Sequence, residues 1–339
     1  MRPRLSLRTE TVLFIVVTLS IMFLFQLPNL LGSENTHVWN RLSMVTPGIV
    51  GFALSWLVRR ELPNAVRFSF TGWRPYLAAF VFPPAVQCIS LGLAYTCRKL
   101  SSQKEFITYT PKNLNASYYQ PFHGGLSLVG IILAIAIAAA PWILIAFAYA
   151  WRWPERLSVK LPRPVALLCV GLLWVPLFWI NDVSLNRIQF RLPGELGEEL
   201  GWRGYIVRKW LHRPLMAAAV SMPLWGIAHL PVIMLPAQRG RVFQNICFLA
   251  AIAMFGAVML KLYRWSQSIW PCAFLHLWWN LSNETVLGDV YGWEPGLFSG
   301  RFWIFNGEGM FGLLIMTPIA AWILWQMQRE ETSATAGHK

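Results

Sequence analysis

Long apolar runs separated by short polar loops recur through this sequence, and they limit what it can fold into. A helix that crosses the hydrocarbon core of a bilayer needs about 17–25 mostly apolar residues. The runs that meet or approach this length are 11–31, 43–58, 75–97, 126–151, 164–182, 214–235, 243–263, 267–283 and 308–327. The sequence therefore predicts an all-α polytopic integral membrane protein.

Not every run is equally convincing as a membrane span. The runs 43–58 and 267–283 are short or interrupted by polar groups, and 194–211 is an amphipathic segment that we count as a further, functional helix. We expect about eight to ten transmembrane helices around a buried polar cavity.

The composition agrees with lipid as the main solvent. Hydrophobic residues make up 56% of the chain and charged residues only 13%, whereas soluble domains average about a quarter charged residues. The 19 tryptophans suit the aromatic belts at membrane–water interfaces. The five cysteines show neither a CxxC nor a CxxxH spacing, so neither a disulfide framework nor a cysteine zinc site is indicated.

The net charge of +14 is explained if the chain is a membrane protein. The basic residues lie in short loops between apolar runs, where they orient the chain and meet anionic lipid headgroups. We therefore expect membrane lipids, and no nucleic acid, as partners.

The N-terminal apolar run is predicted to be a transmembrane helix that is not cleaved off as a signal peptide. Arg2, Arg4 and Arg8 precede the run 11–31, which is longer than the apolar region of about 7–15 residues in a cleaved signal peptide and lacks a small-residue cleavage site after it. We predict a multi-pass protein with its N-terminus inside.

Ten crossings then return the C-terminus to the inner side. Lys and Arg residues are more numerous in the loops on this side, as the positive-inside rule requires. The two longer polar loops, 98–124 and 284–307, both lie on the opposite side in this arrangement.

Ionisable residues inside membrane helices are costly and usually mark function. In the segment 194–211, Glu199 and Arg203 are four residues apart and can form an ion pair on one helix face. Glu198 projects about 100° away from Glu199, since an α-helix has 3.6 residues per turn. Trp202 and Tyr205 share its stripe and would shield it from lipid, which suits a general base.

Two later runs carry the other unusual polar residues. His229 follows Trp225 by one helical turn, and His276 and Asn280 are likewise four residues apart on one face. Each of these residues alone is explained by hydrogen bonding between helices. Together with Glu198 they supply a carboxylate and two imidazoles to activate water, and an amide to stabilise an oxyanion.

These motifs, in this order, resemble the CAAX-protease and bacteriocin-processing (CPBP, or abortive-infection) family. This family includes the type II CAAX prenyl endopeptidases and proteins like lysostaphin resistance protein A. Its pattern is E-E-x-x-x-R, then an aromatic residue with histidine four later, then H-x-x-x-N. Here it reads Glu198-Glu199-Leu-Gly-Trp-Arg203, Trp225-Gly-Ile-Ala-His229 and His276-Leu-Trp-Trp-Asn280. The resemblance covers roughly 165–283, and Trp225 stands where Phe is common.

The resemblance implies an intramembrane endopeptidase acting on a membrane-associated or prenylated peptide. Glu198 would activate water with His229 and His276, and His276 and Asn280 would hold the oxyanion. Glu199 and Arg203 would shape the site. The residues around the motifs are similar to those of bacterial members, which implies the bacterial cytoplasmic membrane.

We predict no cofactor, and water activation without a metal. The H-E-x-x-H zinc motif is absent from the sequence. A zinc site formed by Glu198, His229 and His276 nevertheless stays open, because zinc accepts Glu and His ligands from separate helices.

The predicted organisation has three parts. Residues 1–160 form N-terminal transmembrane helices of unclear role, 161–330 form a CPBP-like catalytic core, and 331–339 form a polar tail. Two other functions remain open: a non-catalytic membrane immunity or scaffold protein of the same fold, and a transporter that uses the buried Glu and His as a proton relay. The absence of an inverted repeat argues against the transporter.

Overall fold

A computed structural model describes residues 5–32, 36–59, 72–110, 183–235 and 238–336. The predicted spans 126–151 and 164–182 lie outside these residues. The chain divides into two compact units, one formed by Met1–Ala116 and Gly194–Lys339 and the other by Ser117–Pro193. The motif residues all belong to the first unit, and the packing below is that of this unit.

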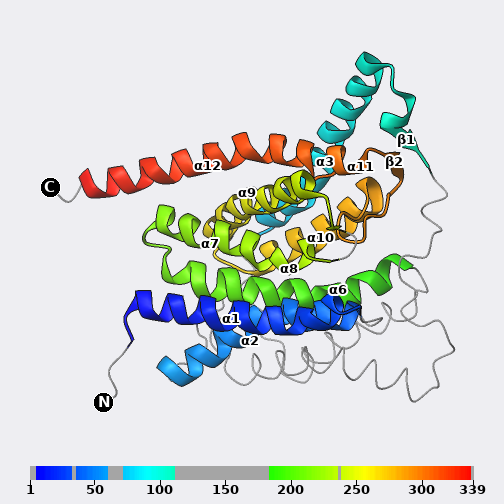
Figure 1. Ribbon diagram of the computed structural model, residues 1–339. Helices are drawn as coiled ribbons and strands as arrows, with labels where there is room; N and C mark the ends of the chain where they lie inside the picture. The colour runs from blue at the N-terminus through cyan, green and yellow to red at the C-terminus, as the bar shows by residue number, and fades with distance from the viewer. Residues whose placement is uncertain (1–4, 33–35, 60–71, 111–182, 236–237, 337–339) are drawn as a thin grey trace, which may run out of the picture. The chain divides into compact units, whose positions relative to one another are not determined.

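The described part of the chain is almost wholly helical (Figure 1). The long helices are α1 (Leu7–Leu30), α2 (Thr36–Arg59), α3 (Arg74–Ser101), α6 (Val183–Glu199), α7 (Pro214–Ala228), α9 (Val242–Ser266), α10 (Trp270–Leu287) and α12 (Met310–Ala336). Helix α6 continues directly into a π-helix, η3 (Leu200–Val207). The short elements are the 3₁₀-helix η1 (Lys104–Phe106), the helices α8 (Leu230–Ile233) and α11 (Phe302–Phe305), and the strands β1 (Ile107–Tyr109) and β2 (Phe298–Gly300).

Local sequence signals explain where several helices begin. Helices α3, α7 and α10 each have proline in the first turn, where its fixed φ suits the helix and its missing N–H costs nothing. The hydroxyl of Ser6 caps α1 by accepting a hydrogen bond from the Thr9 backbone N–H at 3.1 Å.

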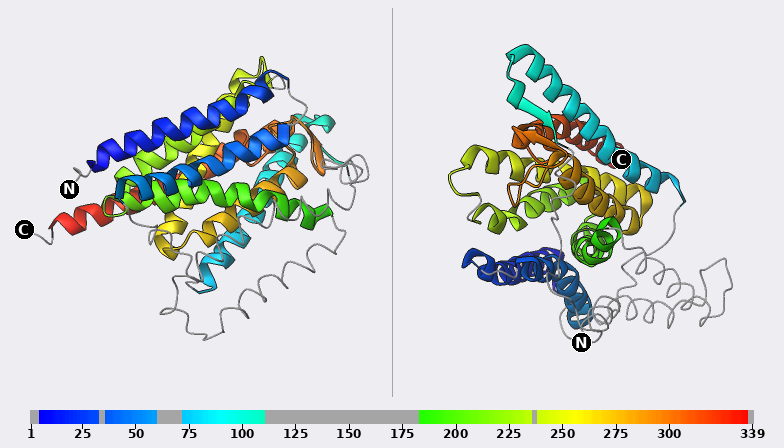
Figure 2. Two further views of the ribbon diagram at one scale, coloured as in Figure 1. Left: turned by 90° about the horizontal axis from the view of Figure 1, so that it is seen from below. Right: turned by 90° about the vertical axis from the view of Figure 1, so that its right-hand side faces the viewer.

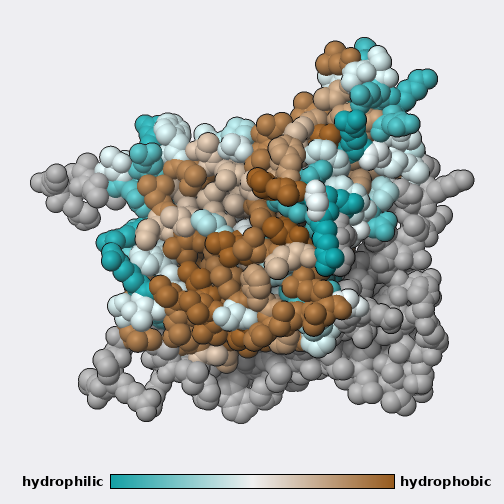
Figure 3. All heavy atoms as spheres, in the orientation of Figure 1, coloured by the Kyte–Doolittle hydropathy of each residue, from teal (hydrophilic) through white to brown (hydrophobic). Residues whose placement is uncertain are grey.

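The predicted fold class is confirmed: the protein is an all-α, polytopic membrane protein. Among the described residues, five stretches are long and apolar enough to cross a membrane: Leu7–Leu30, Arg74–Ser101, Pro214–Ile233, Val242–Ser266 and Phe302–Ser333. Helices α2 and α10 are not among them, in agreement with the short or interrupted runs seen in the sequence. Apolar residues fill the middle of the face seen in Figure 3, between more hydrophilic regions at either side.

The helices pack in two connected groups (Figures 1 and 2). Helix α1 packs on α2, and α2 packs on η3. Helix α9 packs between α7 and α12, and α3 packs along α10. Helix α7 contacts both η3 and α12 and so joins the two groups. Glu198 lies on α6, which continues into η3, and His229 directly follows α7.

The ends of the helices fall at two opposite sides. At one side, Lys209 pairs with Glu10, and Arg264 pairs with Glu330 at 2.6 Å. At the other side, β1 and β2 form an antiparallel pair, with Ile107 opposite Gly300. The two long polar loops thus meet, as expected if both lie on one side of the membrane, although their strand pairing was not predicted.

Glycines allow η3 and the end of α6 to approach α2 closely. A Cβ on Gly201 would lie 2.3 Å from the backbone carbonyl carbon of Pro47, and one on Gly197 would lie 2.6 Å from the Cα of Val45. Small residues at such positions let membrane helices pack backbone against backbone. This contact fixes the helix that carries the two adjacent glutamates.

Candidate active site

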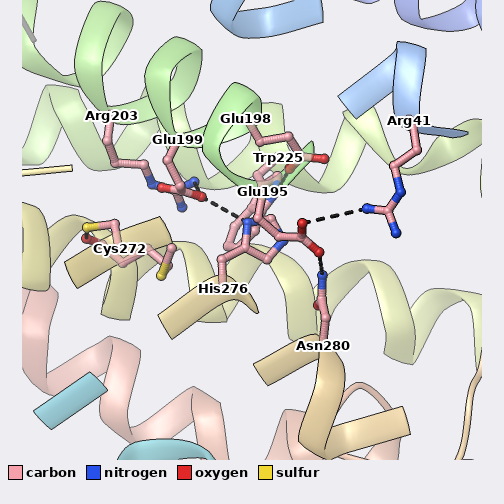
Figure 4. Close-up of polar contacts among 10 residues, drawn as sticks. Arg41, Glu195, Glu198, Glu199, Arg203, Trp225, Cys272, His276 and Asn280 are labelled. Carbon is pink, nitrogen blue, oxygen red and sulfur yellow. Dashed lines mark hydrogen bonds and ion pairs between the residues drawn. The ribbon is translucent and has the colours of Figure 1, made fainter. Parts of the chain in front are cut away.

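Glu199 lies at the centre of a buried polar cluster at the junction of α6 and η3. Its Oε1 accepts hydrogen bonds from Nη1 of Arg203 at 2.9 Å and from Nδ1 of His276 at 3.1 Å (Figure 4). Glu199 and Arg203 are fully buried, and His276 is 4% exposed. The predicted pair is therefore present, and it also binds the histidine of α10.

Glu198 is held by a different partner. Its Oε2 accepts a hydrogen bond from Nε1 of Trp225 on α7 at 3.0 Å. The Trp225 ring makes edge contacts with His276, at 5.3 Å between centroids, and with His229, at 6.2 Å. The guanidinium of Arg203 lies 4.3 Å from the centre of the same ring. Trp225 thus gathers Glu198, both histidines and Arg203 around one indole.

The hydrogen bonds fix the same tautomer in both histidines. Nδ1 of His229 lies 2.7 Å from the carbonyl oxygen of Trp225, and Nδ1 of His276 faces the carboxylate of Glu199. Both oxygens only accept, so each Nδ1 carries the proton. Within the described residues, Nε2 of each ring and Oε1 of Glu198 have no hydrogen-bond partner and remain available to a substrate or a water.

Asn280 binds a third carboxylate, Glu195, which the sequence reasoning missed. Its Nδ2 donates to Oε1 of Glu195 at 3.1 Å, and Nη1 of Arg41 lies 3.6 Å from Oε2 of the same side chain. Glu195 is fully buried between them, as Figure 4 shows. Its position four residues before Glu199, on the same helix face, was the available signal.

The part of the chain that carries these motifs is similar to a known protein family. Residues 190–282 match the family model described as type II CAAX prenyl endopeptidase Rce1-like. The matched stretch contains Glu198, Glu199, Arg203, His229, His276 and Asn280. We refer to this stretch as the Rce1-like domain. The matched family is one of membrane-embedded proteases, and the similarity supports a peptide hydrolase. No curated protein matches the chain.

The structure corrects the expected surroundings of Glu198 in the Rce1-like domain. Trp202 and Tyr205 lie against Phe14 of α1, with centroid distances of 5.8 and 4.9 Å, and the hydroxyl of Tyr205 donates to Glu10. For Tyr205 the expectation assumed 3.6 residues per turn, but η3 is a π-helix with more residues per turn, which turns this position away from Glu198. The aromatic partner of Glu198 is Trp225 instead.

A small hollow lies beside the cluster. Its lining residues are Val232, Gln238, Gln244, Asn245, Phe248, Val290, Trp293, Trp303, Glu308 and Gly309. Phe248 separates it from His229, with ring centroids 5.9 Å apart, and Tyr291 lies against both rings. Burial raises the pKa of Tyr291 well above its ordinary value, and nearby carboxylates raise it further, so this hydroxyl stays protonated.

The described side chains do not form a ready metal site. No three His, Cys, Asp or Glu residues in the described part of the chain are grouped so that they hold one ion. The open set Glu198, His229 and His276 therefore does not fit zinc as these side chains lie.

Proposed function

We propose that the Rce1-like domain is an intramembrane endopeptidase in which Glu198 activates water to hydrolyse a peptide bond. The observation that carries the proposal is the environment of Glu198. Its carboxylate is 3% exposed and anchored at Oε2 by Trp225, while Oε1 has no partner among the described residues. A positioned, partly unpaired carboxylate beside two imidazoles is suited to general-base catalysis.

The neighbouring residues support this chemistry by orienting the reacting atoms. Glu199 and Arg203 position His276 so that its Nε2 is available, and the Trp225 carbonyl does the same for His229. Protonation of His276 would place a second N–H at Nε2, with Glu199 stabilising the positive charge. His276 thus has the means to donate to a developing oxyanion.

Asn280 is suited to the same task. Its amide nitrogen carries two hydrogens, and Glu195 accepts only one of them in the observed bond. The other is available to the oxyanion. Glu195 and Arg41 would act as positioning residues for this amide.

The reaction follows from these roles. Glu198 takes a proton from water, and the resulting hydroxide forms a bond to the carbonyl carbon of the peptide. His276 and Asn280 stabilise the tetrahedral oxyanion. Glu198 then returns the proton to the leaving nitrogen, the C–N bond breaks, and the products are a carboxylic acid and an amine. The substrate class proposed is a membrane-associated or prenylated peptide, because the domain belongs to a CAAX-type protease family.

A cleavage assay on a peptide library in liposomes, including farnesylated peptides, tests the proposal by mass spectrometry. Glu198→Gln should abolish cleavage without lowering the yield of folded protein, because it removes the base and keeps the acceptor for Trp225. Glu199→Gln should also lower the folded yield, since breaking a buried charge network costs about 3–5 kcal/mol. Normal cleavage by Glu198→Gln would overturn the assignment. Specific peptide binding without cleavage by the wild type would favour a non-catalytic binding protein.

Metal content separates this mechanism from zinc catalysis. We expect purified active protein to keep its activity after exhaustive chelation, because the base is a carboxylate and no ion is needed to deprotonate the water. The measurement is elemental analysis alongside the cleavage rate. Stoichiometric zinc, with activity lost on its removal and restored on its addition, would contradict the expectation.

A further inference from the structure

We propose that Tyr291 is a further substrate-binding residue, whose hydroxyl donates a hydrogen bond to a backbone carbonyl of the peptide near the scissile bond. The identification of the acceptor as a peptide carbonyl rests on the proposed function. Tyr291 follows the matched stretch 190–282, so the family similarity assigns it no role. The inference comes from the position of its ring and the state of its hydroxyl.

The loop that follows α10 holds Tyr291 in place. The backbones of Asp289 and Glu294 form an antiparallel bridge, with N to O distances of 2.8 and 2.9 Å. The backbone N–H of Tyr291 donates to Oδ1 of Asp289 at 2.8 Å. From the segment between α8 and α9, the buried Gln238 donates through Nε2 to the carbonyl oxygens of Val290 and Tyr291. The backbone of Tyr291 is thus fixed both within its loop and by a neighbouring segment.

This loop places the ring of Tyr291 against the candidate active site. Its centroid lies 6.4 Å from that of His229 and 5.2 Å from that of Phe248. The His229 ring in turn contacts Trp225, which binds Glu198. An extended peptide advances only about 3.3–3.6 Å per residue. A peptide that is attacked beside Glu198 and extends along His229 therefore reaches Tyr291 within a few residues of the scissile bond.

The hydroxyl of Tyr291 is unused in the free protein. It has no hydrogen-bond partner among the described residues. The side chain is only partly buried, and its hydroxyl is not enclosed, in contrast to buried unpartnered atoms such as Nε1 of Trp202. Such a group can exchange water for a ligand atom without breaking a hydrogen bond inside the protein.

The charge around this hydroxyl selects its role and its partner. Burial raises the pKa of Tyr291 well above its ordinary value, and nearby acidic side chains, Glu198 among them, raise it further. The hydroxyl therefore stays protonated and is able to donate. The same acidic surroundings disfavour an anionic acceptor such as a carboxylate or a phosphate. A neutral carbonyl is the acceptor that a peptide offers at every residue.

The substitution Tyr291→Phe tests the hydroxyl without disturbing the packing. Phenylalanine keeps the ring contacts with His229 and Phe248 and removes one oxygen that has no partner in the described structure. We expect an unchanged unfolding temperature, a KM about fivefold higher and a kcat within about twofold. A bond made equally in the bound and transition states changes KM alone. The measurement is the rate of cleavage against concentration, for the library peptide that the wild type cleaves fastest in liposomes.

The matched control is Tyr109→Phe, the same change at an exposed tyrosine of β1 whose ring packs on Phe298. It should leave both constants unchanged. An unchanged KM in folded Tyr291→Phe would overturn the inference. A fall in kcat alone would place the hydroxyl on the reacting atoms and contradict the binding role. A lower unfolding temperature would show that the hydroxyl bonds within the protein, which also contradicts it.

Modified peptides identify the acceptor. Binding is measured to Glu198→Gln and to Glu198→Gln/Tyr291→Phe, with one peptide bond at a time replaced by an alkene, which has no carbonyl oxygen, or by an ester, which keeps it. We expect one alkene peptide to lose the roughly fivefold difference in affinity between the two proteins, and the ester at the same position to retain it. A difference retained by every alkene peptide would overturn the assignment of the acceptor.

The proposed function fails separately, if the wild type cleaves no peptide. The probe is then a farnesylated fluorescent peptide, whose affinity is compared between the wild type and Tyr291→Phe. About fivefold tighter binding by the wild type would support the binding role of Tyr291 without proteolysis. Equal affinity, or no binding to either protein, would overturn this inference as well.

Discussion

Trp225 is the side chain through which the candidate catalytic residues contact one another. Its indole N–H binds Glu198, its carbonyl binds His229, and its ring contacts His276. Phenylalanine, common at this position in the family that the motifs resemble, provides the ring and the carbonyl but not the N–H donor. The tryptophan in this chain therefore adds one hydrogen bond to Glu198, the proposed base.

The substitution Trp225→Phe measures that bond. We expect the turnover number to fall by about tenfold or more, since a hydrogen bond to a charged group contributes about 1.5–3 kcal/mol. The folded yield should change little, because phenylalanine keeps the stacking on Phe255. Trp322→Phe, at an exposed position on α12, is the matched control. Unchanged turnover in Trp225→Phe would show that Glu198 does not depend on this contact.

Sequence spacing predicted some of these contacts and not others. The Glu199–Arg203 pair lies within one helical turn, so spacing alone revealed it. The bonds from Trp225 to Glu198 and from Asn280 to Glu195 join residues of different helices, and no local pattern reports which side chains will meet. The direction in which each candidate catalytic side chain points therefore depends on how the helices pack against one another.

At the scale of the elements, the close contact between α2 and the α6–η3 helix positions the two glutamates. Glycines at 197 and 201 remove the side chains that would hold the backbones apart. The π-helical stretch explains why Tyr205 does not lie on the same helix face as Glu198. Periodicity in the sequence predicted a helix here correctly, but it carries no signal for the change of pitch that begins at Leu200.

The substitution Gly201→Ala tests this contact. We expect a loss of about 1–3 kcal/mol in stability, because the added methyl group overlaps the backbone of Pro47 and forces the helices apart. Gly92→Ala is the matched control, since a Cβ there meets nothing within 4 Å and alanine favours the helix. Thermal unfolding in detergent measures both. Equal unfolding temperatures for the two variants would contradict the role of the glycine contact.

At the scale of the whole molecule, the described helices have their ends on two sides. The start of α1 and the end of α12 are on one side, and the β1–β2 pair is on the other (Figure 1). Glu10 near the start of α1 pairs with Lys209, and Glu330 near the end of α12 pairs with Arg264. The apolar runs predicted this multi-pass arrangement because span length follows directly from bilayer thickness. They did not predict that the two polar loops pair through β1 and β2, because this pairing joins residues that are far apart in the sequence. The division at residue 160 stays a prediction.

Labelling with a membrane-impermeant maleimide tests which side faces the cell interior. In a variant whose five native cysteines are replaced by alanine, we expect Gln103→Cys to react in intact cells. Glu330→Cys should react only after lysis, because basic loops favour the inner side. The reverse pattern would overturn the predicted orientation. Reaction of both in intact cells would overturn the two-sided arrangement itself.

The strand pair and the hydrogen bond between Gln87 and Ser282, at 2.7 Å, join stretches of chain that are distant in sequence. Gln87 lies outside the matched stretch 190–282, whereas Ser282 is its last residue. The Rce1-like domain therefore shares its packing with segments that a family boundary does not include. An exchange of 190–282 alone for the corresponding stretch of a relative would keep Gln87 but replace Ser282, its partner across this boundary.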